Sequence, residues 1–152
     1  MLNEVAWARG MIEIINRQRK FAVNVLQWEA FTERVLGVVR TVKGQGVTVA
    51  FVSDAAIRKL NLNFRGKDKT TDVLSFPVEP EDFEIGDEPM LGDIIISLAQ
   101  AARQAQENGL TLDEEIAQLI LHGVLHLLGH DHETDGGTMN RLELRLRKKL
   151  GC

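Results

Sequence analysis

The chain has 152 residues, 44% of them hydrophobic and 26% charged, which fits one soluble globular domain over residues 1–152. No apolar run approaches the roughly 20 residues of a membrane helix, and the N-terminal segment lacks the continuous apolar core of a signal peptide. The single cysteine, Cys152, cannot form an intrachain disulfide, and the net charge of −4 taken alone argues against a nucleic-acid partner.

Hydrophobic periodicity predicts alternating strands and helices along the chain. Strands are expected over 10–18, 46–53, 72–78 and 93–97. Helices are expected over 28–44, from Ser53 to about Phe64, over 97–109, over 112–128, and between Thr138 and Leu150. Pro77 restricts the third strand to an edge or an end of a sheet. This order predicts a partly parallel sheet of about four strands, packed by about five helices.

All four histidines lie within the segment HGVLHLLGHDH, residues 122–132. Thr111 and Glu114 have the form of a capping box that opens the helix leading into this segment. On that helix His122 and His126 are one turn apart on the same stripe, about 6 Å along the axis, in an otherwise apolar and buried half. Burying two imidazoles without partners would cost a few kcal/mol, so a compensating partner is expected.

Gly129 suits the position after a helix end where φ is positive, so the chain can turn there and bring His130 or His132 back over the helix. Two histidines at i and i+4 and a third from such a turn match a zinc site with an open fourth position. Glu115, Asp131, Glu133 or Asp135 could orient the ring N–H groups. The alternative, core or surface histidines with hydrogen-bonded partners, fits a lone histidine better than three in this register.

The HxxxHxxGxxH spacing at residues 122–132 is also that of the metzincin proteases, and Met139 follows it as a methionine turn would. Those proteases carry a glutamate general base where this chain has Gly123. The ligand spacing is therefore present while the peptidase base is missing. In a buried helix we expect Gly123 to allow close packing.

The segment HGVLHLLGHDH is similar to the signature H-G-x-L-H-L-x-G-[YH]-D-H of the bacterial YbeY family of rRNA maturation factors. The segments LNLNFRGKDKTTDVLSFP (60–77) and LGDIIIS (91–97) also resemble signatures of that family, in the same order and spacing. The resemblance implies a single-strand-specific endoribonuclease that acts in the maturation of small-subunit rRNA ends and in ribosome quality control.

The same resemblance implies an α+β fold with a four-stranded mixed sheet and a metzincin-like metal site. That site would hold one Zn²⁺ ion per chain on His122, His126 and His132. His130 receives no ligand role, because relatives often have tyrosine there. The implied partners are an rRNA precursor and the ribosomal small subunit or its proteins, in the cytoplasm and without a membrane; the oligomeric state stays open.

The family's functionally important arginine falls on Arg65, in the loop FRGKDK. A guanidinium binds phosphate through a fixed fork, whereas lysines act as point charges. Arg65 is therefore the candidate catalytic and phosphate-binding residue, and Lys67 and Lys69 are candidate substrate-binding residues. The general base stays open, because Asp72 and Asp93 flank strands but fit caps of turns or helices better.

For binding of a nucleic acid, the distribution of charge along the chain matters more than the net charge. Basic residues gather in 56–71 and 141–149, with the acidic segment 79–93 between them, so one face can be positive. With no tyrosine in the chain, platforms for base stacking are sparse. We expect RNA to be recognised mainly through its backbone and shape.

Two alternatives stay open. One is a metzincin-like metallopeptidase, which would use the same three ligands. The other is a non-catalytic ribosome assembly factor with structural zinc, where His130 or an acidic residue of 131–135 would supply the fourth ligand. The number of protein ligands, and whether loss of His126 unfolds the protein or only inactivates it, would separate these alternatives from the nuclease.

Overall fold

A computed structural model describes residues 11–39, 45–78, 90–129 and 137–152. Its strands are β1 (Ile12–Asn16), β2 (Gly46–Val52), β3 (Val73–Pro77) and β4 (Met90–Ser97). Its helices are α2 (Val25–Val38), α3 (Asp54–Arg65), α4 (Leu98–Asn108), α5 (Leu112–Leu127) and α6 (Thr138–Leu150). The end of the helix predicted over 28–44 and most of the acidic segment lie outside the described residues. None of these helices is long and apolar enough to cross a membrane.

Local capping fixes most helix ends close to the predicted places. The Ser53 hydroxyl accepts from the backbone N–H of Ala56 at 3.2 Å, and Thr111 and Glu114 form the predicted capping box. One prediction is wrong: α2 begins before Trp28, because the Asn24 side chain accepts from the Gln27 N–H at 3.2 Å and caps the helix there.

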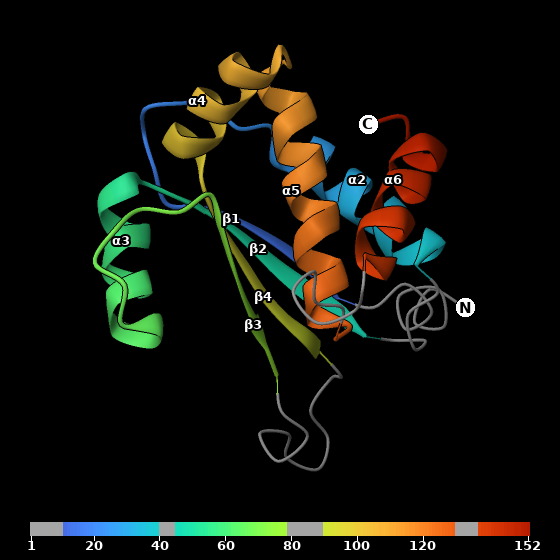
Figure 1. Cartoon of the computed structure of the whole chain (residues 1–152), viewed down its shortest axis with the longest axis horizontal. Coiled ribbons are helices and arrows are strands. Elements are labelled where there is room, and N and C mark those ends of the chain that lie inside the picture. The colour runs from blue at the N-terminus through green and yellow to red at the C-terminus, as the bar shows by residue number, and fades with distance from the viewer. Residues whose placement is uncertain (1–10, 40–44, 79–89, 130–136) are drawn as a thin grey trace.

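The four strands form one mixed sheet in the order β1-β2-β4-β3 (Figure 1). β1, β2 and β4 are parallel, and β3 is antiparallel to β4. The predicted α+β architecture with a four-stranded mixed sheet is therefore confirmed. β3 lies at the edge, where a proline removes no ladder hydrogen bond, as Pro77 predicts.

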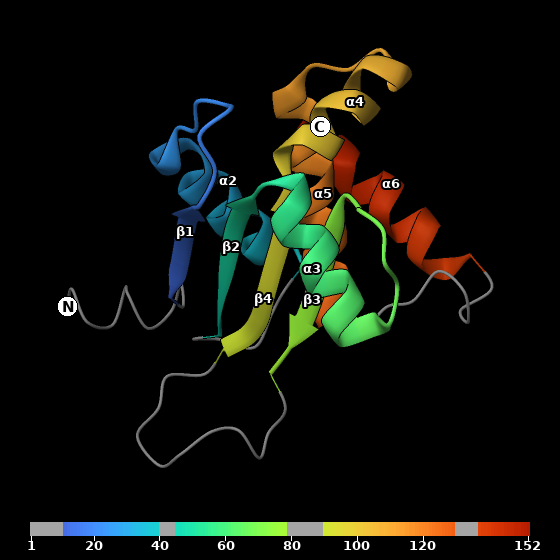
Figure 2. The ribbon, with the colours of Figure 1, turned by 90° about the vertical axis from the view of Figure 1, so that its left-hand side faces the viewer.

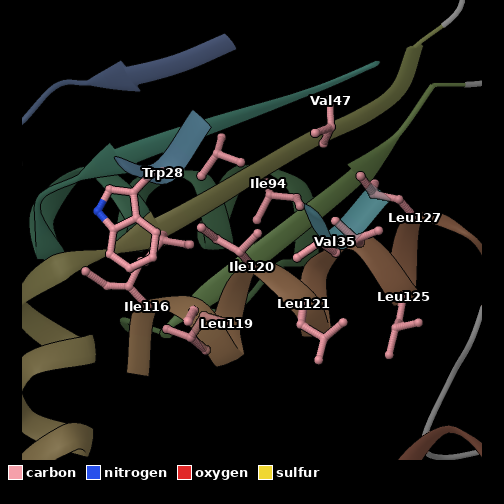
Figure 3. Close-up of a cluster of buried hydrophobic side chains, with 14 of the residues drawn as sticks. Trp28, Val35, Val47, Ile94, Ile116, Leu119, Ile120, Leu121, Leu125 and Leu127 are labelled. Atoms are coloured by element: carbon pink, nitrogen blue, oxygen red, sulfur yellow. The ribbon is translucent and has the colours of Figure 1, made fainter. Parts of the chain in front are cut away.

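Helices cover the two faces of the sheet with different amounts of apolar surface (Figures 1 and 2). α3 lies on one face over a small cluster of Val52, Ile57 and Leu74. On the other face α2, α5 and α6 bury the main core, in which Trp28 and Ile94 meet the apolar residues of α5 (Figure 3). Because its apolar residues pack tightly in this core, α5 is the most constrained helix of the site described below.

α5 approaches the sheet closely at Gly123. A Cβ atom at this position would lie 2.8 Å from Cγ2 of Ile94 in β4, closer than packed carbon atoms come. On the neighbouring edge strand, the Ser75 hydroxyl donates to the Gly123 carbonyl at 3.5 Å. Gly123 therefore permits the close packing expected of it, and this contact sets where α5 lies relative to β3.

Glu115 is a carboxylate buried on α5, only 6% exposed. Gln104 of α4 lies between two carboxylates, and its amide nitrogen donates to Glu115 Oε1 at 3.1 Å and to Asp72 Oδ2 at 3.0 Å. Burial raises the pKa of Glu115, and the negative charge of Asp72 raises it further, while Arg147 and a hydrogen bond from Asn108 act in the opposite direction. Ionisation of Glu115 therefore lowers the stability of the folded protein.

We predict that Gly123→Ala lowers the free energy of unfolding by about 1–3 kcal/mol, because the added methyl group overlaps Ile94. Chemical denaturation measures this change. The matched control is Gly37→Ala on the exposed side of α2, where nothing lies within 4 Å of the new methyl group. The control is expected to raise stability by about 0.5–1 kcal/mol through higher helix propensity. An equal gain at Gly123 would contradict the tight contact.

A second prediction concerns pH. The pKa of Glu115 in the folded protein lies above its ordinary value of 4.5, so the folded state holds this proton more tightly than the unfolded state. The favourable contribution is complete below about pH 4.5 and is lost as pH rises through the raised pKa. We predict that Glu115→Gln raises the thermal midpoint at pH 7 by a few degrees, and that this gain vanishes in acid.

Glu114, which directly precedes Glu115 on the same helix, provides a control in which the expected change of the thermal midpoint has the opposite sign. Its hydrogen bonds with the Thr111 backbone and side chain lower the pKa of Glu114. Glu114→Gln is therefore expected to lower the thermal midpoint at pH 7, with the loss fading as pH falls through the lowered pKa. A lower midpoint for Glu115→Gln at pH 7 would show that its charge stabilises the fold, against this prediction.

Candidate functional site

His122 and His126 converge on the side of α5 that the sheet leaves open. Their Nε2 atoms are 2.9 Å apart, and their ring centroids are 4.5 Å apart. The His122 side chain is 25% exposed, so the pair lies at the boundary between core and solvent. Helical spacing of four residues brings the rings together edge-to-face, with their planes at 67°, and the close contact of Gly123 with the sheet turns them toward β3.

Glu143 of α6 supports His122 from the core side. It is 3% exposed, and its Oε1 lies 3.0 Å from Nδ1 of His122. A carboxylate only accepts, so Nδ1 is the ring nitrogen that donates to Glu143, and in the tautomer with its proton there the lone pair lies on Nε2. The Arg147 guanidinium lies 3.8 Å from the other oxygen, Oε2. The arrangement fixes both the orientation of the ring and its tautomer.

The carboxylate that supports His122 is one that the sequence analysis did not name. Glu115, one of the four candidates, hydrogen-bonds Gln104 instead, and Asp131, Glu133 and Asp135 lie outside the described residues. A signal for Glu143 was present in the sequence. It stands in the apolar stripe of the last helix, at helical spacing from the buried residues Met139, Leu146 and Leu150.

Two imidazoles that point their Nε2 atoms at one another fit as ligands of a divalent cation such as zinc. The buried carboxylate that contacts Nδ1 of His122 is the kind of partner that metal-ligating histidines usually have. Within the described ranges, no group of three or more His, Cys, Asp or Glu side chains is placed to hold a metal ion. His132, the predicted third ligand, and His130 lie outside the described residues.

A groove of about 680 Å³ runs along β3 beside the histidines. Arg65, from the last turn of α3, lines it together with His122 and His126. Lys67 and Lys69 follow α3 in an exposed loop and are not among the residues that line the groove. The structure thus brings the predicted arginine to the same groove as two of the predicted ligands, and the two lysines follow that arginine in the loop after α3.

Asn61 braces the loop that carries these cations. It is 1% exposed, and its Nδ2 donates to the backbone carbonyl of Lys69 at 3.0 Å, while the Lys67 N–H donates to the Asn61 carbonyl at 3.3 Å. Within the loop, Asp68 pairs with Arg58 at 2.8 Å and lowers the surplus of positive charge. The buried amide therefore holds the lysines near Arg65 without using their charges.

The two candidate bases occupy different sides of the sheet. Asp72 lines both the groove and a neighbouring cavity of about 510 Å³, together with His122 in each case. Its Oδ1 accepts from the N–H of Val73 at 2.7 Å, the cap-like role that the sequence favours. Asp93 precedes Ile94, which contacts α5, so alternation along the strand places Asp93 on the face opposite α5. Burial raises the pKa of Asp93, against a hydrogen bond from Thr48, but it lies away from the histidines.

Comparison with known proteins identifies the family to which this chain is similar. A family model described as "Endoribonuclease YbeY" matches residues 13–151. A curated protein named Endoribonuclease YbeY from Sulfurihydrogenibium sp. is 45% identical to this chain, and the match covers 80% of each chain. The curated protein of the same name from Nautilia profundicola is 41% identical, and the match covers 84% of this chain and 88% of the relative. The one from Solibacter usitatus is 56% identical over 98 residues, which are 64% of this chain and 61% of that protein.

The fold agrees with this match. The solution structure of a Thermotoga maritima protein superposes with a TM-score of 0.62 at 30% sequence identity, covering 92% of this chain and 86% of that one. The matched family model extends from β1 to the end of α6 and so includes the histidine pair, its supporting glutamate and the groove arginine. The chain therefore belongs to the YbeY endoribonuclease family.

Proposed function

We propose that this chain is a zinc-dependent endoribonuclease that hydrolyses single-stranded RNA in the maturation of small-subunit rRNA ends and in ribosome quality control. The observation that carries the proposal is the presence of Arg65, His122 and His126 along one groove. The names of the family and of the relatives support RNA as the substrate. We assign His122, His126 and His132 as the ligands of a zinc ion that, when bound, supplies a Lewis acid and a water that ionises near neutral pH.

Arg65 is assigned to the scissile phosphate. Hydrolysis of a phosphodiester builds negative charge on the phosphoryl oxygens, and a guanidinium fork can bind two of them at once. The left-handed conformation of Gly66, with φ of 68°, ends α3 directly after Arg65. The backbone of the arginine therefore stands at a fixed helix end beside the groove.

Lys67 and Lys69 are assigned to neighbouring phosphates of the strand, because the braced loop holds them near Arg65. Contacts of this kind release counterions, so binding weakens with salt by a slope of about −0.7 for each phosphate contacted. They carry no base information. The site of cleavage would then be selected by an rRNA precursor held on the ribosomal small subunit or by one of its proteins.

The environment of Gly123 supports a nuclease over a metzincin-like peptidase. The general base of those peptidases would occupy this position, but a side chain there would point at Ile94 in the sheet and away from the histidine pair. The phosphate-binding arginine beside the histidines also suits a phosphodiester better than a peptide bond.

The decisive experiment is cleavage of single-stranded RNA by purified protein of measured zinc content. We predict that Arg65→Ala lowers kcat/KM by about 10²–10³. Arg65→Lys should recover only part of this loss, because a lysine lacks the fork. His126→Ala should lose both zinc and cleavage. The control is Arg145→Ala, an exposed arginine of α6 that lines a different groove.

Thermal unfolding of the same variants tests the assembly-factor alternative. An open catalytic site predicts that His126→Ala stays folded, with a midpoint close to that of the zinc-free parent. Unfolding of this variant would instead favour a structural zinc. If Arg65→Ala and His126→Ala cleave like the parent, a contaminating nuclease explains the activity and the proposal fails.

A further prediction concerns the support of His122. Glu143→Gln should lower zinc affinity about 10–100-fold, because a neutral amide holds the Nδ1 proton more weakly than a carboxylate does. Competition with a coloured chelator measures this affinity. Arg147→Met is the matched control, since it removes the ion pair to Glu143 and leaves the contact with His122 intact. Equal losses in the two variants would mean that Glu143 acts through the packing of α6 alone.

A further inference from the structure

Phe64 is an aromatic side chain that stays in solvent at the end of α3, one residue before Arg65. It is 66% exposed, whereas the other aromatic residues in the described part of the chain are buried or half-buried. Single exposed apolar residues are ordinary on protein surfaces, so the surroundings of Phe64 decide whether it has a role.

Two features set these surroundings apart. The ring packs edge-to-face against Phe76 of β3, with centroids 5.3 Å apart and planes at 66°, so its orientation is fixed while most of it remains exposed. Both rings line the same groove as Arg65 and the histidine pair. An oriented aromatic ring and a phosphate-binding cation are thus adjacent in the sequence and in the groove.

The edge position of β3 explains how these groups share one groove. Phe76 pairs with Asp93, on the face of the sheet that α3 covers, whereas Ser75 pairs with Ile94 and contacts α5 on the other face. Because β3 is the edge strand of the sheet formed by the described residues, the groove passes around this edge from one face to the other. The phenylalanine rings lie toward α3, and the imidazoles lie toward α5.

We propose that the Phe64 ring, supported by Phe76, is a stacking platform for an unpaired nucleobase of the strand whose phosphate Arg65 binds. The inference rests on the proposed function and adds to it the contact that would select single strands. A base in a duplex is stacked and paired, so it must leave the helix to reach the ring, whereas a base in a single strand presents its face directly. The exposed Lys67 and Lys69, which follow Phe64 and Arg65 in the loop after α3, favour a polyanion over an apolar peptide as the occupant.

This platform also bears on sequence preference. Every base has a face that can stack, so a single phenylalanine contributes affinity for unpaired RNA with little discrimination among bases. The sequence-based expectation of recognition through backbone and shape is therefore extended by one base contact, and selection of the cleavage site still falls to the ribosomal partner.

The test is equilibrium binding of the full-length protein with its metal to a short labelled single-stranded RNA and to an abasic strand of equal length and charge. Fluorescence anisotropy, read at low temperature before cleavage has progressed, reports affinity, and a gel at that time confirms that the strand is still intact; cleavage is measured separately after warming. We expect Phe64→Ala to weaken RNA binding about fivefold to a hundredfold, the range of one lost stacking contact, and to leave the abasic strand unaffected. Phe64→Trp should restore affinity and show fluorescence quenching with RNA only.

Leu62→Ala is the matched control, because Leu62 is an exposed apolar residue of the same helix, 46% exposed, that does not line the groove. An unchanged affinity in Phe64→Ala overturns the platform, and so does an equal loss on the abasic strand or in Leu62→Ala. Failure of the proposed function has a different signature: a zinc-loaded parent that binds single-stranded RNA and does not cut it.

Discussion

The contact between Gly123 of α5 and Ile94 of β4 positions the rest of the site. Without a side chain at 123, the helix lies directly against the sheet, and His122 and His126 line the groove along the edge strand. His122 and His126 reach the groove for this reason. The same contact orients position 123 toward the core, so the site differs from that of a peptidase with a glutamate there through packing, as well as through residue type.

A buried carboxylate links the last helix to this arrangement. Glu143 lies in the apolar stripe of α6 and contacts His122, with Arg147 beside it. An ionised carboxylate in a core is costly unless it is paired and hydrogen-bonded, and here the imidazole and the guanidinium meet that requirement. The basic segment 141–149 therefore has a buried side that supports the histidines and an exposed side that carries its remaining cations.

The groove combines aromatic and charged groups because it lies at the edge of the sheet. A central strand would separate the face covered by α3 from the face covered by α5, but β3 is the edge strand among the strands that the structure describes. Aromatic rings, a guanidinium and two imidazoles from three elements can then line one depression. Short length and a terminal proline also keep this edge from pairing with another chain, so it stays available to a ligand.

The sequence by itself determined the order of the elements, the caps at Ser53 and Thr111, the edge position of β3 and the placement of His122 next to His126, because each depends on residues a few positions apart. Only the tertiary structure decided which carboxylate supports His122, which face of the sheet Asp93 occupies, and that Phe64 lies beside Phe76. Alternation along a strand shows that Asp93 and Ile94 face opposite ways, but only packing shows which of them meets α5. Contacts between residues far apart in the chain depend on how helices settle on the sheet, which local patterns do not encode.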